Sequence, residues 1–259
     1  MIPRALTIAT SDSGGGAGIQ ADLKAFAAAG CHGSSALVAL TAQSTVAVTA
    51  VHELPSEFIV AQLEAVFGDI GVDAAKTGML FSRRIVETVA GFLDGRGVTL
   101  VVDPVMIASS GAQLLQDEAV ETLVSRLFPL ATVVTPNLPE AEALTGLTGA
   151  SRRRLAERLV ELGAAAALVT GGHGATAVDH LFDGHDHFEL PVERHDVLAT
   201  HGAGCTHSAT LAAQLARGLS LAEAAAEAAR VASDAVRNGL VEIGAGEGPV
   251  DVLNLKGGR

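Results

Sequence analysis

The chain has little of several things that would assign it to a class. Its 259 residues include two cysteines, no tryptophan and no tyrosine, and acidic residues outnumber basic ones for a formal net charge of −12. Two cysteines are far too few for a disulfide scaffold. The acidic balance argues against broad binding of nucleic acid or anionic membranes. Long hydrophobic runs are also missing: no uncharged stretch approaches the ~18 apolar residues of a membrane span, and no charged-then-apolar leader opens the chain. We therefore expect a cytoplasmic protein with neither a nucleic-acid nor a membrane partner.

What the chain does have is a regular alternation of short apolar runs with helical patterns. The runs expected to be strands are 5–9, 36–41, 74–77, 98–103, 131–135 and 165–170. The expected helices cover about 18–29, 56–67 and 82–93, start at 117 and 139, and cover 152–162. This alternation predicts an α/β fold in which a mostly parallel sheet has helices on both faces.

The alternation of expected strands and helices changes near the end of the chain. Residues 175–182 and 187–192 alternate around Asp183-Gly184, which predicts a hairpin, and two helices are expected at 205–217 and 221–238. No linker, repeat or composition break interrupts the sequence. We therefore expect one domain covering residues 1–259.

Polar or glycine-rich residues follow every expected strand of the parallel part. These segments are 11–18, 41–45, 76–79, 103–106, 135–140 and 171–173. In a sheet of this kind, ligands bind beyond the carboxyl ends of the strands. The sequence therefore predicts a binding site at this one edge.

The turn before the expected helix at 205 is the most distinctive of the candidate sites. Gly202 and Gly204 open the backbone where the helix begins, so that free N–H groups and the positive end of the helix dipole face any anion. Cys205 lies in the first turn, where the dipole favours its thiolate. The combination predicts chemistry on a phosphate, although free cysteines are more often small buried hydrophobic residues.

Two other glycine-rich segments indicate close approach of a ligand to the backbone. Residues 11–18 lack the Gly-Lys-Ser/Thr of a Walker loop, and Asp22, one turn into the next helix, is expected to face this loop. Residues 172–177 satisfy Gly-x-Gly-x-x-Ala, but a strand rather than a helix is expected to follow. The second segment therefore favours contact with a nucleotide's phosphates or base over dinucleotide binding.

Three residues at the same edge could organise Mg²⁺ through water, namely Asp103, Asn137 and Glu140. Taken singly, Asp103 is also an ordinary strand terminator and Glu140 an ordinary first-turn acid. The nine histidines show no metal-ligand spacing, and we expect them at the surface.

Taken together, these segments resemble the hydroxymethylpyrimidine/phosphomethylpyrimidine kinase family of thiamine biosynthesis, within the ribokinase-like superfamily. The resemblance covers almost the whole chain. Its most specific parts are Ser-Asp-Ser-Gly-Gly-Gly-Ala-Gly-Ile-Gln-Ala-Asp-Leu-Lys (11–24), Lys-Thr-Gly-Met-Leu (76–80), Asp-Pro-Val-Met (103–106), Thr-Pro-Asn-Leu-Pro-Glu-Ala-Glu (135–142), Gly-Gly-His (171–173) and Thr-His-Gly-Ala-Gly-Cys-Thr (200–206). It implies a three-layer ribokinase-like fold and ATP- and Mg²⁺-dependent phosphorylation of hydroxymethylpyrimidine and then of its monophosphate. Relatives are often dimers, so a homodimer is expected.

The resemblance also implies roles for individual residues. Cys205 is expected to act as base toward the hydroxymethyl or phosphate group, with an anion hole supplied by Gly202, Ala203 and Gly204. The residues expected to bind the pyrimidine are Gly18, Asp22, Gln43, Met79 and Val105. Those expected on the nucleotide side are Lys76, Asn137, Glu140, Thr170 and Gly172, with Asp103 and Glu140 toward Mg²⁺.

The chain departs from the family pattern at several positions. Thr10 replaces a usual glycine, Ser44 an asparagine, and Ala203 a threonine, while Ser109 and Thr170 stand where lysines are customary. Losing two cations from an acidic protein should weaken triphosphate binding or slow transfer, which Lys76 and Mg²⁺ could offset in part. Two alternatives therefore stay open: a pyridoxine or pyridoxal kinase of the same fold, and a catalytically weakened relative that only binds the pyrimidine.

Overall fold

A computed structural model of the chain describes residues 1–106, 114–171 and 177–257. One nine-stranded sheet runs through these residues in the order β3-β2-β1-β4-β5-β6-β7-β8-β9. The strands are β1 (Arg4–Asp12), β2 (His32–Gln43), β3 (Val48–Glu53), β4 (Ala74–Thr77), β5 (Thr99–Val102), β6 (Val133–Val134), β7 (Ala167–Val169), β8 (Val178–Phe182) and β9 (His187–Pro191). The six central strands β2, β1, β4, β5, β6 and β7 run parallel to one another. At the two sides of the sheet, β3 pairs antiparallel with β2, and the β8–β9 hairpin pairs antiparallel with β7.

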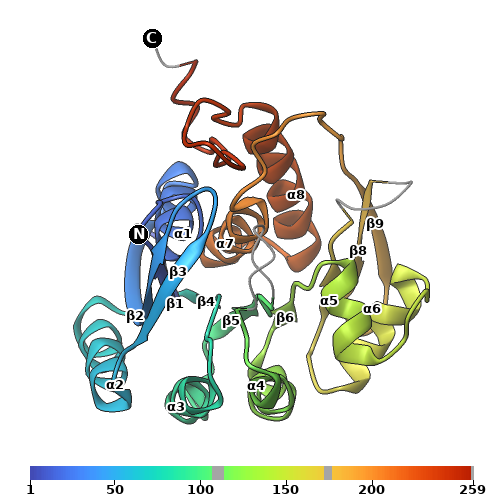
Figure 1. Cartoon of the computed structure of the whole chain (residues 1–259). Coiled ribbons are helices and arrows are strands. Elements are labelled where there is room, and N and C mark those ends of the chain that lie inside the picture. Colours follow the sequence, from blue (N-terminus) through green and yellow to red (C-terminus); the bar gives the residue numbers. More distant parts are fainter. Residues whose placement is uncertain (107–113, 172–176, 258–259) are drawn as a thin grey trace.

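Helices cover both faces of this sheet, as the sequence predicts. They are α1 (Gly18–Ala28), α2 (Ser56–Ala65), α3 (Arg83–Leu93), α4 (Asp117–Thr122), α5 (Leu138–Thr145), α6 (Arg152–Glu161), α7 (Ala203–Ala216) and α8 (Leu221–Arg237). Shorter turns continue two of them, η1 (Val66–Ile70) after α2, and η2 (Leu123–Leu127) and η3 (Phe128–Leu130) after α4. In Figure 1, α1, α7 and α8 lie above the sheet and α2, α3, α4 and α6 lie below it. The expected α/β fold with three layers is confirmed.

The two faces of the sheet are packed by different means. The upper core is rich in alanine, including Ala209 and Ala212 of α7 and Ala224 and Ala228 of α8. Such small side chains let helices approach one another closely, which explains how a chain with so few aromatic residues still has a filled interior. The lower core uses larger side chains, among them Ile59, Leu63, Ile85 and Leu123.

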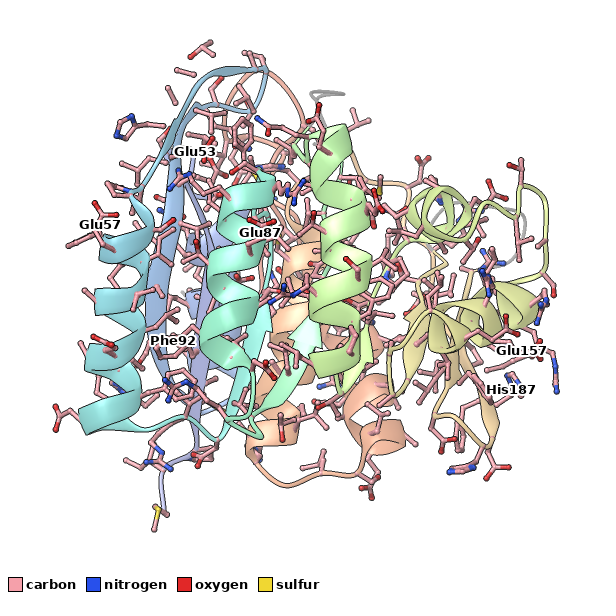
Figure 2. All side chains as sticks on the ribbon, turned by 90° about the horizontal axis from the view of Figure 1, so that it is seen from below. Glu53, Glu57, Glu87, Phe92, Glu157 and His187 are labelled. Atoms are coloured by element: carbon pink, nitrogen blue, oxygen red, sulfur yellow. The ribbon has the colours of Figure 1, made fainter. Side chains whose placement is uncertain are left out.

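Figure 2 looks onto the lower face, where charged side chains cover these helices. Glu57 of α2 and Glu87 of α3 are exposed, and Glu157 of α6 lies 3.5 Å from His187 of β9. Phe92 packs edge-to-face on Phe67. This face is a solvated helical layer.

The main difference from the sequence expectations is at the β2–β3 pair. The strand expected at 36–41 extends over His32–Gln43, and β3, for which no element was expected, pairs antiparallel with it. β3 is an edge strand without a fully buried residue, so the buried apolar run that marks the other strands is missing from its sequence. This longer β2 brings Gln43 to the edge of the sheet where β1 also ends.

Among the helices that the structure describes, none has the length and apolar character needed to cross a membrane.

Candidate active site

A buried ion cluster lies beneath the carboxyl edge of the sheet. Lys76 on β4 has its ammonium 2.9 Å from Asp22 of α1 and 3.7 Å from Asp103, which follows β5. The side chains of Lys76 and Asp22 have no exposed surface at all. Two carboxylates therefore share one ammonium inside the protein.

Neutral groups complete this cluster. The hydroxyl of Thr7 donates to Asp22 at 2.6 Å, and that of Ser208, on α7, donates to Asp103 at 2.7 Å. Gly78 makes the arrangement possible, because a Cβ at this position would lie 2.9 Å from the ammonium nitrogen of Lys76. The glycine of Lys-Thr-Gly-Met thus makes room for the lysine to fold back under the site.

This cluster corrects two sequence expectations. Both oxygens of Asp22 accept hydrogen bonds inside the protein and its side chain has no exposed surface, so in this structure Asp22 lies beneath the site rather than facing it. The charge of Lys76 is compensated by carboxylates below the surface, so it is not a free cation for the phosphates of a nucleotide. Sequence spacing places both residues at the correct edge but gives no information about their depth.

Cys205 lies above this cluster in the first turn of α7. It is partly exposed, and the backbone N–H of Gly18 donates to its sulfur. Burial of the sulfur raises the pKa of the thiol, as do Asp22 and Asp103, while Lys76 and the Gly18 N–H lower it, and together they bring the pKa to about 12. The expected lowering by the helix dipole is thus wrong for the unliganded protein, because desolvation and two buried carboxylates outweigh it.

The turn before α7 is held against the glycine-rich loop. Gly202 has φ +83°, and a Cβ on it would overlap the carbonyl oxygen of Gly16. The N–H of Ala203 donates to the carbonyl of Thr200, so Ala203 is not a free member of the expected anion hole. Gly204 is exposed, and no described residue accepts from its N–H or from that of Cys205. These two N–H groups are the ones that the helix end offers to an anion.

The glycine-rich loop is organised by Asp12, a residue that sequence reasoning did not single out. Its carboxylate accepts hydrogen bonds from the N–H groups of Gly14, Gly16 and Ala17 at 2.7, 3.0 and 2.8 Å. Burial raises the pKa of Asp12, but the bonds from His201 and from these N–H groups outweigh it, and the pKa is lowered. Asp12 therefore remains ionised and fixes the shape of the loop.

The residues expected around a pyrimidine ring come from neighbouring segments. Gln43 ends β2, Val105 is partly exposed just after Asp103, and Met79 is 7% exposed. The carbonyl of Met79 accepts from both the N–H and the hydroxyl of Thr10, at 3.2 and 3.0 Å. The threonine that departs from the family pattern thus ties the end of β1 to the segment that carries Met79.

Asn137 and Glu140 form the N-terminal capping box of α5. The Asn137 side chain accepts from the N–H of Glu140, and the Glu140 carboxylate accepts from the N–H groups of Asn137 and Met106. Burial and the nearby Asp103 raise the pKa of Glu140 to about 7. Thr170 pairs with Asn137 in a short parallel bridge. The expected nucleotide-side residues Asn137, Glu140 and Thr170 are therefore adjacent.

Among the residues described, no group of three or more His, Cys, Asp or Glu side chains could hold a metal ion. Any metal bound by Asp103 and Glu140 would take its remaining ligands from water or substrate. Gly172 and Ser109, also named from the sequence, lie outside the described residues.

Histidines correct a further expectation, because His180 and His207 are buried rather than at the surface. Nε2 of His207, on α7, lies 3.2 Å from Asp179, and the other oxygen of Asp179 accepts from the N–H of Gly171 at 2.6 Å. This pair links α7 to the start of the segment after β7. The sequence around an isolated histidine does not indicate whether its side chain pairs with a distant carboxylate.

Comparison with known proteins places this arrangement in a family. The family model described as phosphomethylpyrimidine kinase matches residues 12–251. This chain belongs to the phosphomethylpyrimidine kinase family. The hydroxymethylpyrimidine/phosphomethylpyrimidine kinase of Rhizobium meliloti is 48% identical over 95% of both chains.

Solved structures of similar proteins share the fold of this phosphomethylpyrimidine kinase family member. The pyridoxal kinase of Bacillus subtilis, solved as an ADP complex, superposes with a TM-score of 0.90 at 37% identity and covers 99% of both chains. The phosphomethylpyrimidine kinase of Clostridium difficile has a TM-score of 0.81 at 41% identity, covering 91% of this chain and 100% of its own. The expected ribokinase-like fold and the resemblance drawn from the sequence motifs are both confirmed.

Replacing Lys76 with methionine should destabilise the protein by about 3–5 kcal/mol, because Asp22 and Asp103 would lose the ammonium between them while staying buried. Urea unfolding measures the loss. Lys24→Met, at an exposed lysine whose ammonium donates to the carbonyl of Gly15, serves as the control and should change stability by no more than about 1 kcal/mol. A Lys76→Met protein as stable as the control would contradict the assigned charge cluster.

Glu140 should titrate near pH 7, and Asp103→Asn should lower its pKa by removing a neighbouring negative charge. Because the folded-state pKa is raised from 4.5, protonated Glu140 favours the folded state at low pH, and this contribution is lost as the pH rises through about 7. Carboxyl ¹³C NMR measures the titration. Glu223 is a matched reference, since it occupies the same capping-box position in α8 but is exposed, and its pKa is lowered by bonds from Ser220. Equal midpoints for the two residues would refute the assigned environment.

Proposed function

We propose that this protein transfers the γ-phosphoryl group of ATP to hydroxymethylpyrimidine and then to its monophosphate, in thiamine biosynthesis. The observation that carries the proposal is the turn at the start of α7, where Cys205 and two N–H groups without an acceptor among the described residues lie together above the buried cation Lys76. The similarity to the hydroxymethylpyrimidine/phosphomethylpyrimidine kinase of Rhizobium meliloti supports the same reaction.

The α7 turn would bind the phosphoryl group during transfer. Phosphoryl transfer needs accurate positioning and stabilisation of charge on the equatorial oxygens more than covalent chemistry. The N–H groups of Gly204 and Cys205, with the positive end of the α7 dipole, supply donors for those oxygens. Gly202 holds the turn against the glycine-rich loop so that the donors stay in place.

Cys205 would act as the base in the first transfer. The hydroxymethyl O–H gives its proton to the sulfur, the oxygen forms a bond to the γ-phosphorus, and ADP leaves as that phosphorus–oxygen bond breaks. A thiol with a pKa of about 12 forms a strong base when ionised, although little of it is ionised near pH 7. Lys76 favours the thiolate from below.

The pyrimidine would lie between Gln43, Met79, Val105 and the backbone near Gly18. An aminopyrimidine needs a hydrogen-bonding amide and an apolar slot, which the side chains of Gln43 and Met79 can provide.

ATP would lie toward Asn137 and Thr170; the solved pyridoxal kinase of Bacillus subtilis, which shares this fold, holds ADP. Asp103 and Glu140 suit Mg²⁺ held through water, because burial and the nearby Asp103 raise the pKa of Glu140 and a cation would relieve the repulsion between the two carboxylates. Such an ion would neutralise charge on the phosphates.

A pyridoxal kinase is the second candidate, because the Bacillus subtilis pyridoxal kinase covers 99% of this chain with a TM-score of 0.90. A parallel assay of ADP release with Mg-ATP and hydroxymethylpyrimidine, its monophosphate or pyridoxal separates the two. We expect turnover with both pyrimidines and a higher kcat/KM for them than for pyridoxal. Release of ADP with pyridoxal alone would replace the first proposal with the second.

The two transfers should depend differently on Cys205. The hydroxymethyl group must lose a proton, whereas the phosphate monoester, with a pKa near ~6, is already ionised at neutral pH. Cys205→Ala should therefore lower kcat of the first transfer by about 10²–10⁴ and that of the second by less than about tenfold.

The pH profile provides the control for this assignment. For the first transfer, kcat/KM should rise about tenfold per pH unit between pH 7 and 9, because the thiolate fraction rises in this way below a pKa of about 12. Cys205→Asp should flatten this rise. Equal losses in both transfers for Cys205→Ala would show that Cys205 acts on the phosphoryl group rather than as base.

A further inference from the structure

His201, which immediately precedes the α7 turn, connects three segments of the site. Its N–H donates to the carbonyl of Gly248 at 3.2 Å, and its carbonyl accepts from the N–H of Val250 at 3.0 Å. Its side chain is 12% exposed and packs on Gly16, where a Cβ would overlap the imidazole ring. The ring therefore has a fixed position beside the glycine-rich loop.

The ring nitrogen Nε2 of His201 faces two polar groups. It lies 3.2 Å from the carboxylate of Asp12 and 3.4 Å from the side-chain amide nitrogen of Gln43. Asp12 is held ionised by three backbone N–H groups, and its pKa is lowered. A lone pair on Nε2 would be repelled by this carboxylate, so Nε2 carries a proton and donates it.

The hydroxyl of Thr41 contacts the Gln43 amide at the end away from His201. Its oxygen lies 3.0 Å from the carbonyl of Ser11 and 3.1 Å from the side-chain amide oxygen of Gln43, so two acceptors face this hydroxyl. One hydroxyl has one proton. If the Thr41 proton goes to Ser11, the Thr41 oxygen is free to accept from Gln43.

These contacts allow one consistent orientation of the Gln43 amide. The nitrogen and oxygen ends of an amide are nearly alike in shape, so the surrounding donors and acceptors decide between them. With its oxygen toward Nε2–H of His201 and its NH₂ toward Thr41, the Asp12 carboxylate and the Gln43 oxygen share the Nε2 proton, and Thr41 accepts from Gln43 while it donates to Ser11. The orientation that the structure shows, with the amide nitrogen toward His201, sets a donor against the N–H of His201 and leaves the single Thr41 proton with two acceptors, so we infer that the amide is turned over.

We propose that His201, held by Asp12, is a positioning residue that fixes the orientation of the Gln43 amide and thereby the preference for an aminopyrimidine. This inference rests on the proposed function. An aminopyrimidine carries an amino donor next to a ring-nitrogen acceptor, so an amide matches it in one orientation alone. Pyridoxal has no amino group beside its ring nitrogen, so its binding does not depend in the same way on the orientation of the Gln43 amide.

The test compares two substitutions at His201. Leucine removes the donor and keeps much of the volume, whereas glutamine places an N–H near the position of Nε2. His201→Leu should raise KM for hydroxymethylpyrimidine about tenfold, the scale of one lost hydrogen bond, while KM for ATP and kcat/KM for pyridoxal stay within about twofold. His201→Gln should restore KM to within about threefold of the unchanged protein.

His195→Leu is the matched control, because His195 is also partly buried and pairs with a hydroxyl, that of Ser233, on α8. It should leave both KM values unchanged. Equal effects of His201→Leu on the pyrimidine and on pyridoxal, or no recovery with His201→Gln, would overturn the inference. Absence of pyrimidine phosphorylation by the unchanged protein would instead overturn the proposed function.

A measurement on the unchanged protein does not depend on how the variants fold. ¹⁵N NMR of histidine-labelled protein at neutral pH should show a proton on Nε2 of His201, with the signal assigned from the His201→Gln spectrum. An Nε2 without a proton would contradict the orientation assigned to Gln43.

Discussion

The site depends on the buried attraction between the Lys76 ammonium and the carboxylates of Asp22 and Asp103. It joins β4, α1 and the end of β5, and Ser208 links the cluster to α7. Burying three charges is costly unless each is paired and hydrogen-bonded. The neutral donors Thr7 and Ser208 meet that requirement. The cluster also sets the electrostatic surroundings of Cys205, because it places one positive and two negative charges beneath the thiol.

The surface of the site is built on a second constraint, the close approach of two glycine turns. A Cβ on Gly202 would overlap the carbonyl oxygen of Gly16, and a Cβ on Gly16 would overlap the ring of His201. Asp12 shapes one turn and His201 leads into the other, and the two side chains pair. The segments proposed to bind the pyrimidine and the phosphoryl group are therefore packed against each other, so a substitution in one turn would displace the other.

Sequence reasoning anticipated the layers of the fold and the edge that carries the site, because buried parallel strands and glycine-rich turns leave strong local patterns. It missed β3, whose exposed edge position removes the apolar run, and it misjudged the depth of Asp22 and Lys76 and the pKa of Cys205. Depth and pairing arise from contacts between residues far apart in the chain. Asp12, His201 and Asp179 act through such contacts, and their local sequence gives no sign of them.

The central claim is that the α7 turn receives the phosphoryl group while Cys205 faces the attacking hydroxyl. The most direct measurement is a crystal structure of the protein with ADP, hydroxymethylpyrimidine and aluminium fluoride, a mimic of the transferring phosphoryl group. The account predicts the mimic within hydrogen-bond distance of the N–H groups of Gly204 and Cys205, with the hydroxymethyl oxygen beside the Cys205 sulfur. A mimic bound away from this turn, or a hydroxymethyl group directed away from Cys205, would contradict it.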